Sequence, residues 1–138
     1  FSAQLIKSLT EEQITQNFHL NFHEFPEDAR FMIADRMKMR QTDEYDYYCR
    51  MIPKCVSAML NAPIFDDLKN LALPTLVLFG EYDRLIPNKV LHPKLTVQSV
   101  FENGTNEIPN ASILKINDAG HFPQWEQAEQ VNEILLRE

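Results

Sequence analysis

An aspartate and a histidine each stand just after an apolar run that is followed by a glycine. Asp83 comes three residues after Gly80 in the stretch TLVLFGEYDRLIP, and His121 directly follows Gly120 in NDAGHFPQWE. A carboxylate in contact with an imidazole holds the ring in one tautomer and stabilises the cation that forms when the ring takes up a proton. Asp83 and His121 are therefore the candidate acid and base of a proton-transfer site.

Two short apolar segments must bring these residues together. Residues 75–79 are a short apolar run of the kind found in buried parallel strands, and residues 111–117 are a second candidate strand with Ile113, Leu114 and Ile116. Between them we expect a short helix over residues 94–102 and a loop at NGTN, and after them a helix that begins at Pro123. Functional groups collect at the carboxyl ends of such strands, and neighbouring strands lie about 4.8 Å apart. The pattern predicts an α/β fold in which the two loops meet.

The first 62 residues differ in character from residues 63–138, and the change lies near NAPIF. Helices are expected over residues 11–20, 26–40 and 43–61. Thr10 and Gln13 fit a capping box for the first of these, Pro26 suits the first turn of the second, and Thr42 is placed to cap the third. The sequence therefore predicts a helical segment followed by a βα segment.

Composition limits the possible partners. The 138 residues carry a formal net charge of -7 with a pI near 5.1, which argues against binding to nucleic acid or to an anionic membrane. The longest apolar run is far shorter than the roughly 20 residues of a membrane span. Cys49 and Cys55 do not make a disulfide framework, which favours a reducing, cytoplasmic location. We expect a small-molecule partner and no cofactor.

The βα segment resembles the C-terminal end of an α/β-hydrolase. The family's seventh strand and triad acid resemble the segment LPTLVLFGEYDRLIP of this chain. The family's eighth strand, triad histidine and final helix resemble the segment ILKINDAGHFPQWEQAEQVNEIL. The resemblance implies that residues 1–62 are an inserted cap and that residues 63–138 are the end of the core. It also implies catalytic roles for Asp83 and His121.

The family pattern also requires a nucleophile on a G-x-S-x-G elbow that precedes the triad acid. The serines are Ser2, Ser8, Ser57, Ser99 and Ser112, and none has a glycine two residues before it. The resemblance therefore implies that the nucleophile and strands one to six belong to an upstream segment or to a second chain. Two strands alone cannot bury both faces of a parallel sheet, so we expect this chain not to fold alone.

The elbow residue would decide the reaction. A serine implies hydrolysis of an ester, thioester, amide or carbon-carbon bond, and an aspartate implies attack on an epoxide or alkyl halide. An elbow without a nucleophile implies a binding protein without turnover. Leu85, Ile86 and Phe122 are candidates for an apolar wall, so we expect a small, largely apolar ester-like or carbonyl substrate. The run GHFPQWEQAEQVN is similar to meta-cleavage carbon-carbon hydrolases, although Trp125 can equally be a packing residue.

Four other polar residues have alternative roles. His19 and His23 have the i, i+4 spacing of a helical metal pair, but no third ligand stands nearby and we expect no metal. Asp118 is an alternative acid in the same loop as the histidine, where a turn-forming role is also open. Glu126, in the first turn of the final helix, is expected to favour the positive end of that helix.

Overall fold

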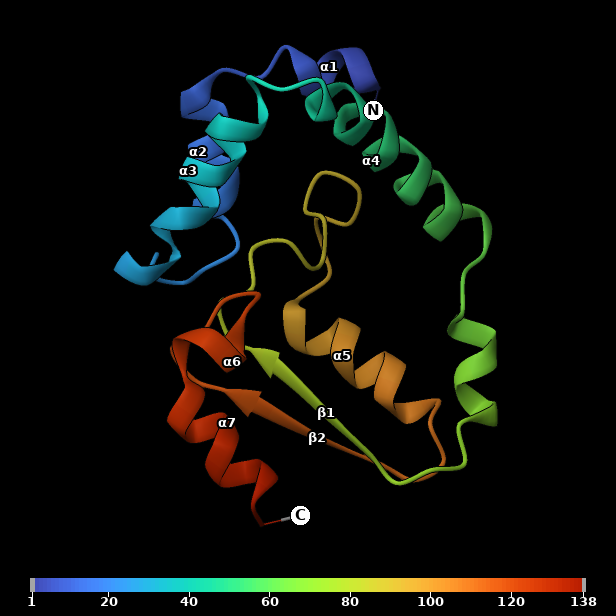
Figure 1. Cartoon of the computed structure of the whole chain (residues 1–138). Helices are drawn as coiled ribbons and strands as arrows, with labels where there is room; N and C mark the ends of the chain where they lie inside the picture. Colours follow the sequence, from blue (N-terminus) through green and yellow to red (C-terminus); the bar gives the residue numbers. More distant parts are fainter. Residues whose placement is uncertain (1, 138) are drawn as a thin grey trace. The chain divides into compact units, whose positions relative to one another are not determined.

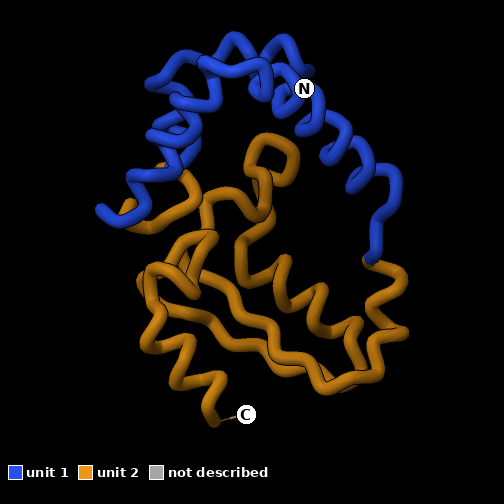
Figure 2. The backbone as a smooth tube through the Cα atoms, in the orientation of Figure 1, with its two compact units in different colours: residues 1–18, 27–64 blue, residues 19–26, 65–138 orange. Residues whose placement is uncertain are grey.

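The structure is a computed structural model that describes residues 2–137, and the chain divides into two compact units (Figures 1 and 2). The first comprises the chain up to Phe18 together with Glu27–Ile64, and the second comprises His19–Pro26 and the chain from Phe65 onward. The sequence predicted a boundary after residue 62, and it did not predict that residues 19–26 belong to the second unit. A cap role for the first unit stays a prediction.

The first unit is helical. Its α-helices are α1 (Ala3–Lys7), α2 (Glu11–His19), α3 (Arg30–Met39) and α4 (Glu44–Asn61), with a 3-10 turn at Glu27–Ala29, and the last residue of α2 falls in the second unit. The capping box is confirmed, because the Gln13 amide donates to Thr10 Oγ1 at 3.2 Å and the Thr10 amide donates to Gln13 Oε1 at 2.9 Å. Helix α1 had no predicted counterpart.

The expected cap of α4 is wrong. The hydroxyl of Thr42 donates to the carbonyl oxygen of Met39 at 2.8 Å, so it closes the turn after α3 and leaves no side-chain cap on α4. Helix α4 is instead held by its packing on α1, where Ile6, Tyr45 and Cys49 form a buried cluster. An ion pair of 2.6 Å from Lys7 to Asp46 joins the same helices, and the hydrogen bond from Lys7 lowers the pKa of the Asp46 carboxyl.

The second unit contains the sheet. Strands β1 (Thr75–Gly80) and β2 (Ala111–Ile116) pair in parallel, with Thr75 opposite Ala111 and Gly80 opposite Ile116 (Figure 1). Both predicted strands are confirmed. Their carboxyl ends lie side by side, as the register requires.

Helices cover the two faces of this sheet. Phe79 of β1 stacks on Phe101 of α5 (Val97–Asn106), with the ring centroids 4.9 Å apart. The preceding residue, Leu78, packs on the opposite face against a cluster that includes Ile116 and Val131 of α7 (Ala128–Leu135), because neighbouring strand residues point to opposite faces. The single helix predicted from Pro123 onward is divided in two: the short helix α6 (Pro123–Glu126) begins at the proline, and the backbone leaves the helical conformation at Gln127 before α7.

The expected loop at NGTN is wrong. Residues 103–106 form the last turn of α5, and the helix begins three residues later than predicted. Thr96 and Ser99 form a capping box at its start, with the Ser99 amide 3.0 Å from Thr96 Oγ1 and the Thr96 amide 2.9 Å from Ser99 Oγ. Packing of Phe101 on the sheet outweighs the low helix propensity of Gly104.

Among the described helices, none is long and apolar enough to cross a membrane.

Candidate active site

Two glycines allow the strand ends to approach each other. A Cβ atom on Gly80 would overlap the carbonyl oxygen of Gly120 and would lie 2.5 Å from that of Ala119. The backbone amides of Glu81 and Tyr82 continue the contact beyond the strands, donating to Ile116 and Ala119 at 2.9 and 2.8 Å. The loop after β1 is therefore fixed directly against the loop after β2.

This approach brings Asp83 and His121 into contact. Nδ1 of His121 lies 2.8 Å from Oδ2 of Asp83, and the carboxylate side chain is only 3% exposed. The histidine side chain is 32% exposed. The carboxylate accepts a hydrogen bond only if Nδ1 carries the proton, so this contact selects the tautomer that leaves Nε2 free to accept a proton. The structure thus joins the two predicted site residues.

The other carboxylate oxygen of Asp83 has a structural partner. Oδ1 accepts hydrogen bonds from the amides of Leu85 at 2.8 Å and Ile86 at 3.1 Å. The turn-forming role that an aspartate has at such positions is therefore present together with the contact to the histidine. Because each oxygen serves one role, the turn fixes the direction in which the carboxylate meets the ring.

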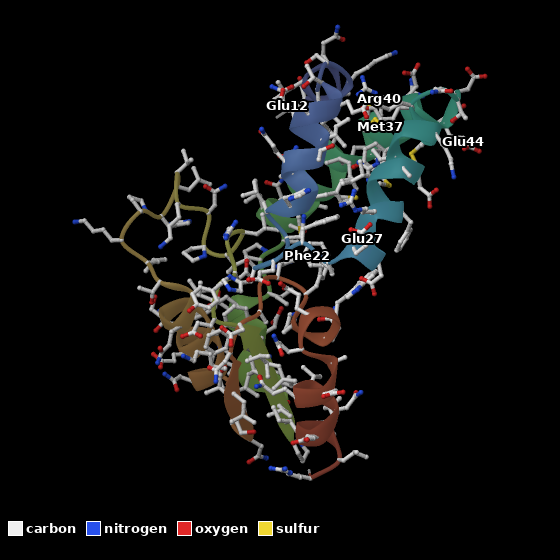
Figure 3. The ribbon with its side chains drawn as sticks, turned by 90° about the vertical axis from the view of Figure 1, so that its left-hand side faces the viewer. Glu12, Phe22, Glu27, Met37, Arg40 and Glu44 are labelled. Carbon is white, nitrogen blue, oxygen red and sulfur yellow. The ribbon has the colours of Figure 1, made fainter. Side chains whose placement is uncertain are left out.

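The three residues expected to form an apolar wall lie beside these two groups in the chain and are all half-buried: Leu85, Ile86 and Phe122. The ring of Phe122 lies 5.4 Å from the imidazole of His121 and also 5.4 Å from the ring of Phe22. Phe22, which is labelled in Figure 3, is fully buried and also meets the ring of Trp125 edge-on, 6.2 Å away. Trp125 therefore has a packing role in this unit.

The alternative residues have other contacts. Asp118 is exposed, adopts a φ of 52°, and accepts a hydrogen bond from the Gln127 side chain through its backbone carbonyl at 2.9 Å. His19 stacks on Phe25, with centroids 4.2 Å apart, and His23 stacks on the ring of Tyr82 at 4.1 Å. Within residues 2–137 no group of three or more potential metal ligands is present. The geometry favours Asp83 as the acid partner of His121.

Sequence reasoning missed two features of the site. The segment 19–26 packs against the loop that carries His121, whose amide donates to the carbonyl oxygen of Asn21 at 2.8 Å. Glu126 does not act simply at a helix end, because its carboxylate accepts hydrogen bonds from three backbone amides of this region. The contacts of residues 21, 23 and 24 with His121 and Glu126 join residues about a hundred positions apart, and no local pattern in the sequence signals them.

Comparison with known proteins finds similarity to several hydrolytic enzymes. No family model matches it. It is 26% identical over 137 residues to 2-hydroxy-6-oxononadienedioate/2-hydroxy-6-oxononatrienedioate hydrolases of Pseudomonas putida and Burkholderia vietnamiensis, with 96% of this chain and 44% of each relative covered. A putative non-heme chloroperoxidase of Synechocystis is 31% identical over 71 residues, which cover 51% of this chain and 22% of that protein.

Two solved structures are similar over nearly the whole chain. A probable hydrolytic enzyme of Pseudomonas aeruginosa PAO1 matches with a TM-score of 0.83 at 20% identity, covering 98% of this chain and 46% of that one. A thermophilic esterase matches with a TM-score of 0.58 at 21% identity, covering 98% and 48%. The chain thus spans less than half the length of these relatives and neighbours.

Proposed function

Because this chain has the fold of the C-terminal part of an α/β-hydrolase, we propose that it supplies the acid and the general base of a hydrolase. The observation that carries the proposal is the 2.8 Å contact between the buried carboxylate of Asp83 and Nδ1 of His121. The two residues lie in the loops that follow neighbouring parallel strands, in the order acid then histidine that the fold uses for its triad.

In the proposed reaction His121 moves protons and Asp83 orients it. Nε2 takes the proton of the attacking hydroxyl, and later the proton of the hydrolytic water, while the carboxylate stabilises the imidazolium formed. General-base assistance of this kind contributes about a hundredfold to ten-thousandfold in rate. Oδ1 stays on the turn amides of Leu85 and Ile86 throughout, so the carboxylate needs no reorganisation.

The nucleophile is proposed to be a serine outside these 138 residues, on an upstream segment or a second chain that also carries strands one to six. None of the serines here stands in a G-x-S-x-G elbow. The relatives are more than twice as long as the matched region, which leaves room in them for such a segment. A serine is favoured over an aspartate because the structural neighbours include an esterase.

The substrate is proposed to be a small ester-like or carbonyl compound with a largely apolar acyl part. The half-buried residues Leu85, Ile86 and Phe122 support the apolar part. A second candidate is hydrolysis of a carbon-carbon bond next to a carbonyl group, which the names of the 26% identical relatives favour, since they act on 6-oxo compounds. Both reactions use the same base and the same type of nucleophile.

A substrate panel separates these possibilities. For the full protein that carries this chain, we expect turnover of 4-nitrophenyl esters of short fatty acids and none of an epoxide or a haloalkane. Turnover of a 2-hydroxy-6-oxo dienoate in place of the esters would favour the carbon-carbon hydrolase. The readouts are release of 4-nitrophenolate, loss of dienoate absorbance, and chromatography of diol or halide. Turnover of only the epoxide or haloalkane would point to an aspartate nucleophile. Ligand binding without any turnover would make the protein a receptor on this scaffold.

A further inference from the structure

The carboxylate of Glu126 is fully engaged by the backbone. Oε1 accepts from the amides of His23 at 2.7 Å and Glu24 at 3.0 Å, and Oε2 accepts from the amide of Gly120 at 2.6 Å. The side chain belongs to a half-buried residue at the end of α6. Hydrogen bonds to an ionised acceptor are roughly twice as strong as those between neutral groups, so three of them make a strong local clamp.

The clamp acts on the residue next to the proposed base. Gly120 immediately precedes His121, and the two backbone amides bond in succession, the first to Glu126 and the second to the carbonyl oxygen of Asn21 at 2.8 Å. A Cβ atom on Gly120 would lie 2.6 Å from the amide nitrogen of His23, so the two backbones are already in close contact there. Glu126 therefore binds both sides of the contact that fixes the histidine loop.

We propose that Glu126 is a positioning residue for His121, acting through the backbone of Gly120 and of residues 23 and 24. The inference rests on the proposed function, because it assigns Glu126 a part in placing the general base. The hydrogen bonds of the Glu126 carboxylate go to backbone amides, so its effect is on the position of the imidazole ring and not on the chemistry of the ring.

Glutamine cannot replace this carboxylate. Its amide has one acceptor oxygen, and the NH₂ group that stands for the other oxygen is a donor. Whichever way it turns, a donor meets either the amide of Gly120 or the amides of His23 and Glu24. Because a displacement of about 1 Å can cost a hundredfold in rate, we expect Glu126→Gln to lower kcat by roughly 10- to 100-fold with KM within about threefold of the wild type.

Two further variants make the test specific. Glu126→Asp keeps two acceptor oxygens on a shorter stem, so it is expected to retain several-fold more kcat than Glu126→Gln. Glu129→Gln is the matched control, since it removes a charge from an exposed position in the first turn of α7, and it should leave kcat unchanged. All variants are made in the full protein and assayed on its best substrate, and hydrogen exchange of the amides of Gly120, His23 and Glu24 is measured alongside.

The expected result is faster exchange of these three amides in Glu126→Gln together with the fall in kcat. Unchanged exchange, unchanged kcat, or a change in KM alone would overturn the proposal. If Glu126→Gln does not fold, Glu126→Asp carries the same test. A failure of the proposed function looks different, because His121→Ala would then keep full activity whatever the Glu126 variants do.

Discussion

Asp83→Asn is expected to lower kcat by about 10⁴-fold while leaving the protein folded. Asparagine keeps the Oδ1 acceptor for the turn amides of Leu85 and Ile86, so the loop after β1 retains its local support. The oxygen that faces Nδ1 of His121 becomes an NH₂ donor, which favours the opposite tautomer and places a proton on Nε2. The substitution therefore removes the orienting role and spares the structural one.

A double-mutant cycle gives this prediction its control. His121→Ala should lower kcat by a similar factor, and the combined variant should be little worse than either single one, because the two residues act as a unit. Asp118→Asn changes an exposed carboxylate in the loop that leads to His121, and it should leave kcat nearly unchanged. Near-normal turnover by Asp83→Asn with loss of turnover in Asp118→Asn would show that the acid has been assigned wrongly.

Gly120→Ala is expected to destabilise the folded protein by about 3 kcal/mol or more, or to prevent folding. The added Cβ would lie 2.6 Å from the amide nitrogen of His23 and 2.6 Å from the carbonyl carbon of Phe22. Both are backbone atoms, and Phe22 is fully buried, so the clash cannot be relieved by turning a side chain. Urea denaturation of the full protein measures the loss.

Gly104→Ala is the matched control for that substitution. Gly104 lies inside α5, and a Cβ atom there would meet nothing within 4 Å. Alanine in an open helical position stabilises by about 0.5–1 kcal/mol relative to glycine, so this variant should unfold at a slightly higher urea concentration. If Gly120→Ala were as stable as Gly104→Ala, the backbone of Gly120 could not lie as close to that of Phe22 and His23 as the structure has it.

Local patterns were sufficient to predict the elements that carry the chemistry. Two apolar runs ended by glycine loops predicted both strands and the pairing of Asp83 with His121, because parallel neighbours bring their carboxyl ends together. The comparisons confirm the predicted fold class and the resemblance to the C-terminal part of α/β-hydrolases. The catalytic roles of these residues stay proposals.

Two of the misses have their physical origin in long-range contacts. Residues 103–106 have low helix propensity, yet they form the end of α5 because the stacking of Phe101 on Phe79 holds the helix on the sheet. The carboxylate of Glu126 binds the amides of His23 and Glu24, which precede it in the chain by 103 and 102 positions. The local sequence around Glu126 contains neither of these two partners. From the sequence, Glu126 is therefore interpreted only as an acidic residue that favours the positive end of a helix.

The most direct test of the central claim is peptide mapping after reaction of the full protein with a fluorophosphonate, which labels activated serines. The account predicts a single adduct on a serine outside residues 1–138, formed at the wild-type rate in Asp118→Asn and far more slowly in His121→Ala. An adduct on one of the serines of this chain, or labelling that is indifferent to His121, would contradict it.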